Sequence, residues 1–197
     1  NIRCIVLKYP DEDREIVKEF DYGAELEYIV TKEERNLFLC NLVGHCNGNT
    51  LCLFQFVEKH GEPLYNIIND KYKDRKVFFV YGGVSTDTRE EIREIVENET
   101  DAIIVASYGT FSTGINIRNI DNIVFASPSK SKIRVLQSLG RGLRLGDKSK
   151  SLKVFDISDD LSTAGGRLNF TLRHFKERIN IYDEQRFDYE IRRINLK

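Results

Sequence analysis

Three side chains in the last third of the chain have the types and the spacing of a phosphate-binding group. Gln137, Arg141 and Arg144 follow one another at intervals of four and three residues, so a helix would place them on one face. A guanidinium group presents a planar fork of N–H donors that matches the oxygens of a phosphate. A solvated basic helix face with accidental spacing is the alternative, and the spacing by itself leaves both interpretations open.

The charge of the chain is unevenly placed around this group. Residues 129–153 carry eight basic residues and one acidic residue, whereas residues 11–34 carry ten acidic and three basic residues. Because the formal net charge of the whole chain is −1, the asymmetry predicts a local anion site and not a polybasic protein. Gly140 and Gly142 would each cost a helix about 1 kcal/mol relative to alanine, but they would let a ligand or another backbone approach closely.

A second candidate phosphate contact is the segment 105–116, which continues from an apolar run. Its residues are mostly small, and they include Ser107, Thr110 and Gly114. Such a segment can offer hydroxyls and backbone N–H groups to a phosphate or a ribose. An ordinary turn between a strand and a helix is the alternative.

A third candidate is the segment 81–89. Gly82 and Gly83 end an apolar run there, and Ser85 or Thr86 can cap the helix that is expected to follow. Free N–H groups at a helix N-terminus form an anion site. A plain turn is the alternative for this segment too.

The elements that must position these residues follow an alternating pattern. Short apolar runs predict buried strands at residues 50–56, 76–81, 101–107, 122–127 and 152–158. Helical patterns lie between them, at residues 31–46, 62–72, 86–98 and 133–144. Thr31 and Glu34 are expected to form a capping box at the first of these helices. Continuous apolar strands separated by helices predict an α/β fold with a parallel sheet covered on both faces, and ligands of such sheets gather at the carboxyl ends of the strands.

The tail after residue 158 has a different pattern. An amphipathic helix is predicted by apolar residues that repeat at intervals of three and four: Leu168, Leu172, Phe175, Ile179 and Tyr182. Residues 187–196 alternate apolar and polar side chains, as a strand does. We therefore expect a C-terminal helix and strand that pack on the sheet or on another domain.

Several groups that catalysis would need are missing from the sequence. It contains no G-x-x-x-x-G-K-[ST] loop and no acidic magnesium motif, so the chain can touch nucleotide phosphates but lacks the parts that hold the triphosphate and the metal. The four cysteines lack the spacing of zinc ligands, so we predict no metal site and expect buried thiols in a reducing, cytoplasmic compartment. No apolar run approaches the roughly 18 residues of a membrane span. The chain begins at Asn1 and contains no methionine, so we expect it to be a fragment of a longer protein.

Taken in order, these segments resemble the second RecA-like motor domain of superfamily 2 helicases. The shared segments are Y-G-G, R-E-E, A-I-I-V-A-S, T-G-I-N, I-V-F-A and Q-S-L-G-R-G-L-R. The resemblance implies a RecA-like fold for residues 31–158. It also implies that residues 1–30 are a linker from a preceding N-terminal motor domain, and that residues 159–197 are a C-terminal helical extension.

The resemblance also implies roles for individual residues. Two arginines would act as fingers that stabilise the transferring phosphoryl group: Arg141 and Arg144. Four residues would contact ATP: Gln137, Gly140, Gly114 and Asn116. Six residues would contact nucleic acid: Gln55, Phe56, Gly82, Gly83, Ser107 and Thr110. Ser107 stands where the family usually has threonine, and Asn116 stands where many members have aspartate.

The function that the resemblance implies is ATP-driven unwinding or branch migration of DNA, in recombination, repair and the processing of stalled forks. ATP and Mg²⁺ would be held mainly by the N-terminal RecA-like domain, and the chain by itself would hydrolyse no ATP. The expected partners are that domain and DNA with branches or single-strand junctions, or an RNA–DNA hybrid, and no membrane is expected. The alternatives are a nucleic-acid-binding module without hydrolysis and the motor domain of a restriction or remodelling translocase.

Overall fold

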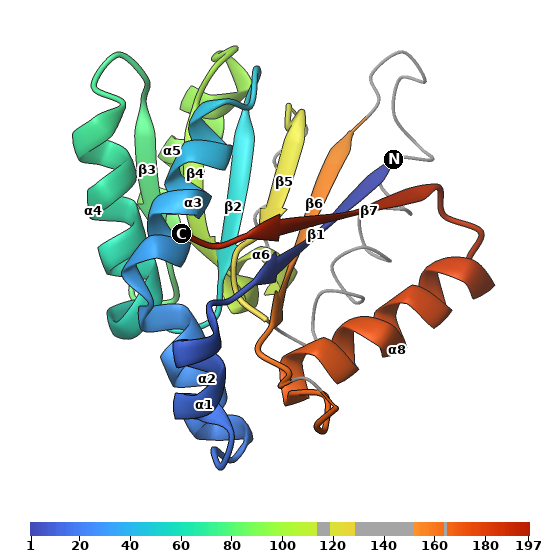
Figure 1. Ribbon diagram of the computed structural model, residues 1–197. Coiled ribbons are helices and arrows are strands. Elements are labelled where there is room, and N and C mark those ends of the chain that lie inside the picture. Colours follow the sequence, from blue (N-terminus) through green and yellow to red (C-terminus); the bar gives the residue numbers. More distant parts are fainter. Residues whose placement is uncertain (114–118, 129–151, 164) are drawn as a thin grey trace.

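The computed structural model describes residues 1–113, 119–128, 152–163 and 165–197. Within them, seven strands form one sheet in the order β3-β4-β2-β5-β6-β1-β7 (Figure 1). All neighbouring strands run parallel to each other. The strands are β1 (Ile2–Lys8), β2 (Thr50–Phe54), β3 (Val77–Val80), β4 (Ile103–Ser107), β5 (Asn122–Phe125), β6 (Lys153–Asp160) and β7 (Tyr189–Asn195). The predicted α/β fold with a parallel sheet is confirmed.

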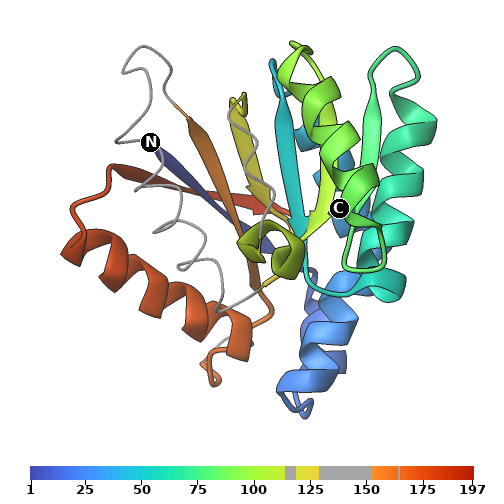
Figure 2. The same ribbon diagram turned by 180° about the vertical axis from the view of Figure 1, so that it is seen from behind.

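Helices cover both faces of the sheet. One face packs against α1 (Asp11–Val17), α2 (Tyr22–Thr31), α3 (Glu33–Gly44) and α4 (Glu62–Lys71). The other face, seen in Figure 2, packs against α5 (Thr86–Glu97), α6 (Tyr108–Thr113) and α8 (Phe170–Glu184). A π-helical turn, η1 (Val57–Gly61), leads from β2 into α4. In the part of the chain that the structure describes, no helix is long and apolar enough to cross a membrane.

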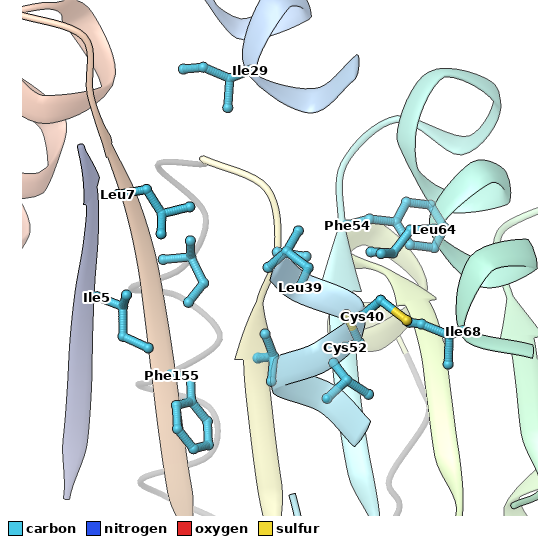
Figure 3. Close-up of a cluster of buried hydrophobic side chains, with 14 of the residues drawn as sticks. Ile5, Leu7, Ile29, Leu39, Cys40, Cys52, Phe54, Leu64, Ile68 and Phe155 are labelled. Atoms are coloured by element: carbon cyan, nitrogen blue, oxygen red, sulfur yellow. The ribbon is translucent and has the colours of Figure 1, made fainter. Parts of the chain in front are cut away.

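The side chains of β2 show why the strands are apolar along their whole length. Successive side chains of a strand point to opposite faces, so Leu51 and Leu53 join one core and Cys52 and Phe54 join the other. Because helices bury both faces, each of these four residues is at most 1% exposed. Figure 3 shows the second core, which includes Cys40 of α3 and Cys52 of β2. All four cysteines are buried, as the sequence predicted.

Most of the predicted elements are present with small changes at their ends. The five predicted strands correspond to β2, β3, β4, β5 and β6, and every end lies within two residues of its prediction. The helices predicted at residues 62–72 and 86–98 are α4 and α5, and the predicted tail elements are α8 and β7. The helix predicted at residues 133–144 lies outside the described residues.

The predicted capping box at Thr31 is wrong. Thr31 is the last residue of α2, and its hydroxyl donates to the carbonyl oxygen of Glu27 at 2.8 Å. The N-cap of α2 is instead Asp21, whose carboxylate accepts from the backbone N–H of Ala24 at 2.8 Å. Because a helix already ends at Thr31, its hydroxyl faces carbonyl groups behind it and cannot cap α3, which begins at Glu33.

The sheet continues across both boundaries that the sequence predicted. β1 lies between β6 and β7 and pairs with both, so residues 1–30 and 159–197 complete the same sheet as residues 31–158. Glu25 of α2 also holds the start of α8, because its carboxylate accepts from the backbone N–H groups of Phe170 and Thr171 at 2.9 and 2.8 Å. The first 30 residues therefore contribute a strand to this sheet, and their role as a linker from a preceding motor domain stays a prediction.

Candidate nucleic-acid and nucleotide site

The parallel sheet brings the described candidate residues to one edge. Gln55 follows β2, Gly82 follows β3, Ser107 ends β4 and Ser127 follows β5. The strands β3, β4, β2 and β5 are consecutive neighbours, and the carboxyl ends of parallel strands lie at the same edge of a sheet. This shared end of the four strands is called the carboxyl edge below.

The end of β2 presents one polar and one aromatic side chain. Gln55 is exposed and Phe56 is half-buried. The backbone N–H of Gln55 donates to the Ser127 hydroxyl at 3.0 Å, which fixes the backbone while leaving the amide side chain at the surface. An exposed amide at this position can donate to a phosphate oxygen.

The loop after β3 is a tight turn that Gly82 leaves uncovered. The N–H of Val84 donates to the carbonyl oxygen of Tyr81 at 3.0 Å and closes the turn. A Cβ atom at Gly82 would meet nothing within 4 Å, whereas one at Gly83 would lie 2.5 Å from the Tyr81 ring. Neither glycine has a positive φ. A side chain at Gly83 would therefore have to displace the Tyr81 ring. Among the described residues nothing requires glycine at Gly82, where the missing side chain leaves the backbone open to an external group.

Ser107 and Thr110 face each other at the end of β4. Their hydroxyl oxygens are 2.7 Å apart, and the backbone N–H of Thr110 donates to the Ser107 hydroxyl at 3.4 Å. Ser107 is half-buried, but Thr110 is 3% exposed. Thr110 thus supports Ser107 at the start of α6 and does not present its own hydroxyl at the surface.

The four residues predicted to contact ATP and the two predicted arginine fingers lie outside the described residues. The first group is Gly114, Asn116, Gln137 and Gly140, and the second is Arg141 and Arg144. Pro128, which follows β5 at the carboxyl edge, is the last described residue before residues 129–151. Among the described residues, no group of three or more His, Cys, Asp or Glu side chains could hold a metal ion. The described part of the edge therefore fits neutral contacts to a phosphate backbone, and it offers no ligand set for Mg²⁺.

Ser127 and His60 are buried residues of this edge that the sequence did not identify. The Ser127 hydroxyl lies 2.7 Å from Nδ1 of His60, and the Ser127 carbonyl oxygen accepts from the Tyr108 hydroxyl at 3.0 Å. Burial, together with the positive charge of Arg35, lowers the pKa of His60 to about 3, so its ring is neutral at pH 7. The position of Ser127 directly after an apolar strand was visible in the sequence, but the residues that contact its hydroxyl and its carbonyl oxygen come from distant segments.

Comparison with known proteins identifies the family to which this fold belongs. Residues 34–146 match the model of the helicase conserved C-terminal domain. The chain is 34% identical to the ATP-dependent DNA helicase uvsW of Enterobacteria phage T4, over 99% of this chain and 41% of that protein. It superposes on the crystal structure of T4 UvsW with a TM-score of 0.86, over 100% of this chain and 42% of the UvsW chain. It is also 26% identical to the putative ATP-dependent helicase IRC3 of Saccharomyces cerevisiae, over 66% of this chain and 17% of that protein.

The fold and the matched segment define a RecA-like C-terminal motor domain of the superfamily 2 helicase class. This chain belongs to the helicase conserved C-terminal domain family, and UvsW of phage T4 is a relative that it resembles along its whole length. The resemblance predicted from the sequence is confirmed. The chain spans about two fifths of the length of UvsW.

Proposed function

We propose that this chain is the C-terminal motor half of an ATP-dependent DNA helicase or translocase. The observation that carries the proposal is the 34% identity to an ATP-dependent DNA helicase over 99% of the chain. The carboxyl edge supports it, because Gln55 is exposed there and Gly82 leaves its backbone uncovered. For the complete protein we propose unwinding or branch migration of DNA in recombination, repair and stalled-fork processing.

Nucleic acid would be held mainly through its phosphate backbone. The Gln55 amide and the backbone N–H groups around Gly82 are donors at the ends of two strands of one sheet, and Phe56 adds an aromatic surface beside Gln55. Contacts to phosphates position a protein on nucleic acid without reading its sequence. Tracking along a strand would therefore be largely independent of sequence.

The chain's contribution to ATP hydrolysis would come from residues 129–151. ATP, bound with Mg²⁺ mainly by the preceding motor domain, would supply the phosphoryl group whose transfer drives movement. Arg141 and Arg144 would stabilise the negative charge on that group, an effect of roughly 10³–10⁵ in rate in related systems. Gln137 and Gly140, with Gly114 and Asn116 from the segment before β5, would contact the nucleotide.

Replacement of one arginine in the complete protein tests this proposal. Arg144→Ala should lower DNA-stimulated ATP turnover by roughly 10³ or more, while binding of an ATP analogue is retained, because the finger acts on charge that develops during transfer. Lys150→Ala removes a positive charge from the same basic stretch and should leave turnover unchanged. Steady-state ATPase assays with a branched oligonucleotide, together with analogue titration, measure both effects.

Two outcomes would count against the proposal in different ways. Normal turnover in Arg144→Ala would remove the finger assignment. A complete wild-type protein without DNA-stimulated ATPase would instead favour a nucleic-acid-binding module that does not hydrolyse ATP.

A further inference from the structure

Ser127 is a point where three segments of the carboxyl edge meet. Its side-chain oxygen accepts from the N–H of Gln55 and contacts Nδ1 of His60, and its carbonyl oxygen accepts from the hydroxyl of Tyr108. Gln55 belongs to the end of β2, His60 to η1 and Tyr108 to the start of α6. One buried residue, 0% exposed, therefore joins the ends of β2, β4 and β5.

The contact between His60 and Ser127 is unusual for a purely structural bond. His60 is 0% exposed, and its Nε2 atom has no hydrogen-bond partner among the described residues. A buried polar atom without a partner disfavours folding, and its presence in a native structure calls for an explanation. His60 also lies in a π-helical turn, a rare helix form that is frequent at functional sites. The bond to Ser127 is possible in either tautomer of the ring, because a hydroxyl can donate or accept.

The position of Ser127 in the chain suggests what the bond does. On one side, it holds the backbone of Gln55, which we place in contact with nucleic acid. On the other side, it is followed directly by Pro128 and then by residues 129–151, which contain Arg141 and Arg144. Because the hydrogen bonds of Ser127 join the ends of β2 and β5, a displacement of Gln55 would be transmitted to the point where the chain leaves β5.

We propose that Ser127 and His60 are positioning residues that couple nucleic-acid contact at the end of β2 to ATP hydrolysis. This inference rests on the proposed helicase function and adds the route by which DNA stimulates turnover. Coupling between two binding sites is reciprocal, so where DNA strengthens nucleotide binding through this pair, bound nucleotide strengthens DNA binding by the same factor. Neither residue touches the reacting groups. Removal of the hydrogen bond between Ser127 and His60 therefore uncouples nucleic-acid contact from ATP hydrolysis without abolishing either.

The test uses the complete protein and two matched serines. Ser127→Ala should lower the ratio of DNA-stimulated to basal ATPase by about fivefold or more, the lower range of typical coupling between sites. Its affinity for a branched oligonucleotide should no longer rise when a non-hydrolysable ATP analogue is added. Ser158→Ala is the control, because Ser158 is 1% exposed and its hydroxyl accepts from Arg178 at 2.7 Å on the side of α8. The control should keep both the stimulation and the analogue effect.

A second pair of variants protects the test against a folding defect in Ser127→Ala. His60→Asn keeps an amide near the position of Nδ1 and should retain the stimulation, whereas His60→Leu should lose it. Undiminished stimulation of the ATPase by DNA in both Ser127→Ala and His60→Leu would overturn the inference. An equal loss of stimulation in Ser127→Ala and Ser158→Ala would also overturn it, because the loss would then reflect a general loss of stability. Absence of DNA-stimulated ATPase in the wild type would be a failure of the proposed function itself, and the coupling would fall with it.

Discussion

The carboxyl edge and the strand β6 use polar groups in opposite ways. The candidate polar groups at the described part of the edge are neutral, and some of them are open to solvent. The Gln55 side chain is exposed, and no described residue would contact a Cβ atom at Gly82. On β6, Asp156 and Asp159 are charged residues with no exposed surface, and both are satisfied from within the chain. A buried charge must be paired, so these two aspartates stabilise the fold, whereas the edge retains donors for an external partner.

The two aspartates of β6 are paired in the same manner on the two faces of the sheet. Arg178 of α8 donates to both oxygens of Asp156 at 2.8 and 3.0 Å, and Arg35 of α3 donates to both oxygens of Asp159 at 2.7 and 3.1 Å. A tyrosine hydroxyl completes each site, from Tyr182 to Asp156 at 2.7 Å and from Tyr9 to Asp159 at 2.9 Å. A buried, bidentate ion pair thus joins each face of β6 to a helix. The two pairs stabilise the sheet whose strand ends form the carboxyl edge.

The largest effect is expected when one of these pairs is broken. Arg178→Ala would remove a bidentate ion-pair partner from the buried Asp156 carboxylate, and breaking a buried pair typically costs about 3–5 kcal/mol of unfolding free energy. Urea unfolding followed by circular dichroism measures the loss. Arg3→Ala is the matched control, because Arg3 pairs with Glu190 at 3.2 Å with 45% of its side chain exposed, and exposed pairs contribute only about 0.2–1 kcal/mol. Equal losses of unfolding free energy in the two variants would show that the buried ion pair contributes no more than the exposed one. The contrast between β6 and the carboxyl edge would then be wrong.

A smaller, pH-dependent effect is expected from His60, the buried titratable group of the edge. Its folded pKa is about 3, below the value of about 6.5 for an unfolded histidine. The unfolded state therefore binds more protons between these two values, so this contribution to stability is complete above about pH 6.5 and declines as the pH falls towards 3. Between pH 7 and pH 5 the loss should be about 2 kcal/mol.

His60→Asn separates this effect from the other titrating groups. Asparagine has no proton to gain in this range, so the variant should lose less stability than the wild type between pH 7 and pH 5, by that same amount. Unfolding titrations at the two pH values measure the difference. Parallel pH profiles for the two proteins would mean that His60 is not held neutral by burial.

The contrast between edge and scaffold also marks how far the sequence could predict the structure. The apolar runs and helical periods set the strands, the parallel sheet and the tail elements, because each depends on neighbours within one segment. Gln55, Gly82 and Ser107 could be assigned to one edge by the same local logic. The pairs of Asp156 with Arg178 and Asp159 with Arg35 join residues 22 and 124 positions apart, and no local pattern reports such contacts.

The position of β1 was missed for a related reason. An apolar run at the start of the chain does not reveal which strands it will pair with, and β1 lies between β6 and β7, which are the last two strands in the sequence. The capping box predicted at Thr31 is wrong for the opposite reason. Thr31 and Glu34 have the correct spacing, but Thr31 is already the last residue of α2 and cannot cap the helix that follows.

The smallest effect on stability, and the sharpest test of the open edge, is expected at the two neighbouring glycines. Gly82→Ala should change the unfolding free energy by no more than about 0.5 kcal/mol, since its Cβ would enter open space. If a phosphate approaches that backbone, the same methyl group should weaken DNA binding. Gly83→Ala would place a Cβ 2.5 Å from the Tyr81 ring, so it should disturb the turn and lower stability as well. Fluorescence anisotropy with a labelled oligonucleotide, set beside unfolding curves for both variants, separates the two effects. Unchanged DNA affinity in Gly82→Ala would mean that the uncovered backbone is not a contact, and the contrast between an open edge and a self-contained scaffold would then rest on Gln55 alone.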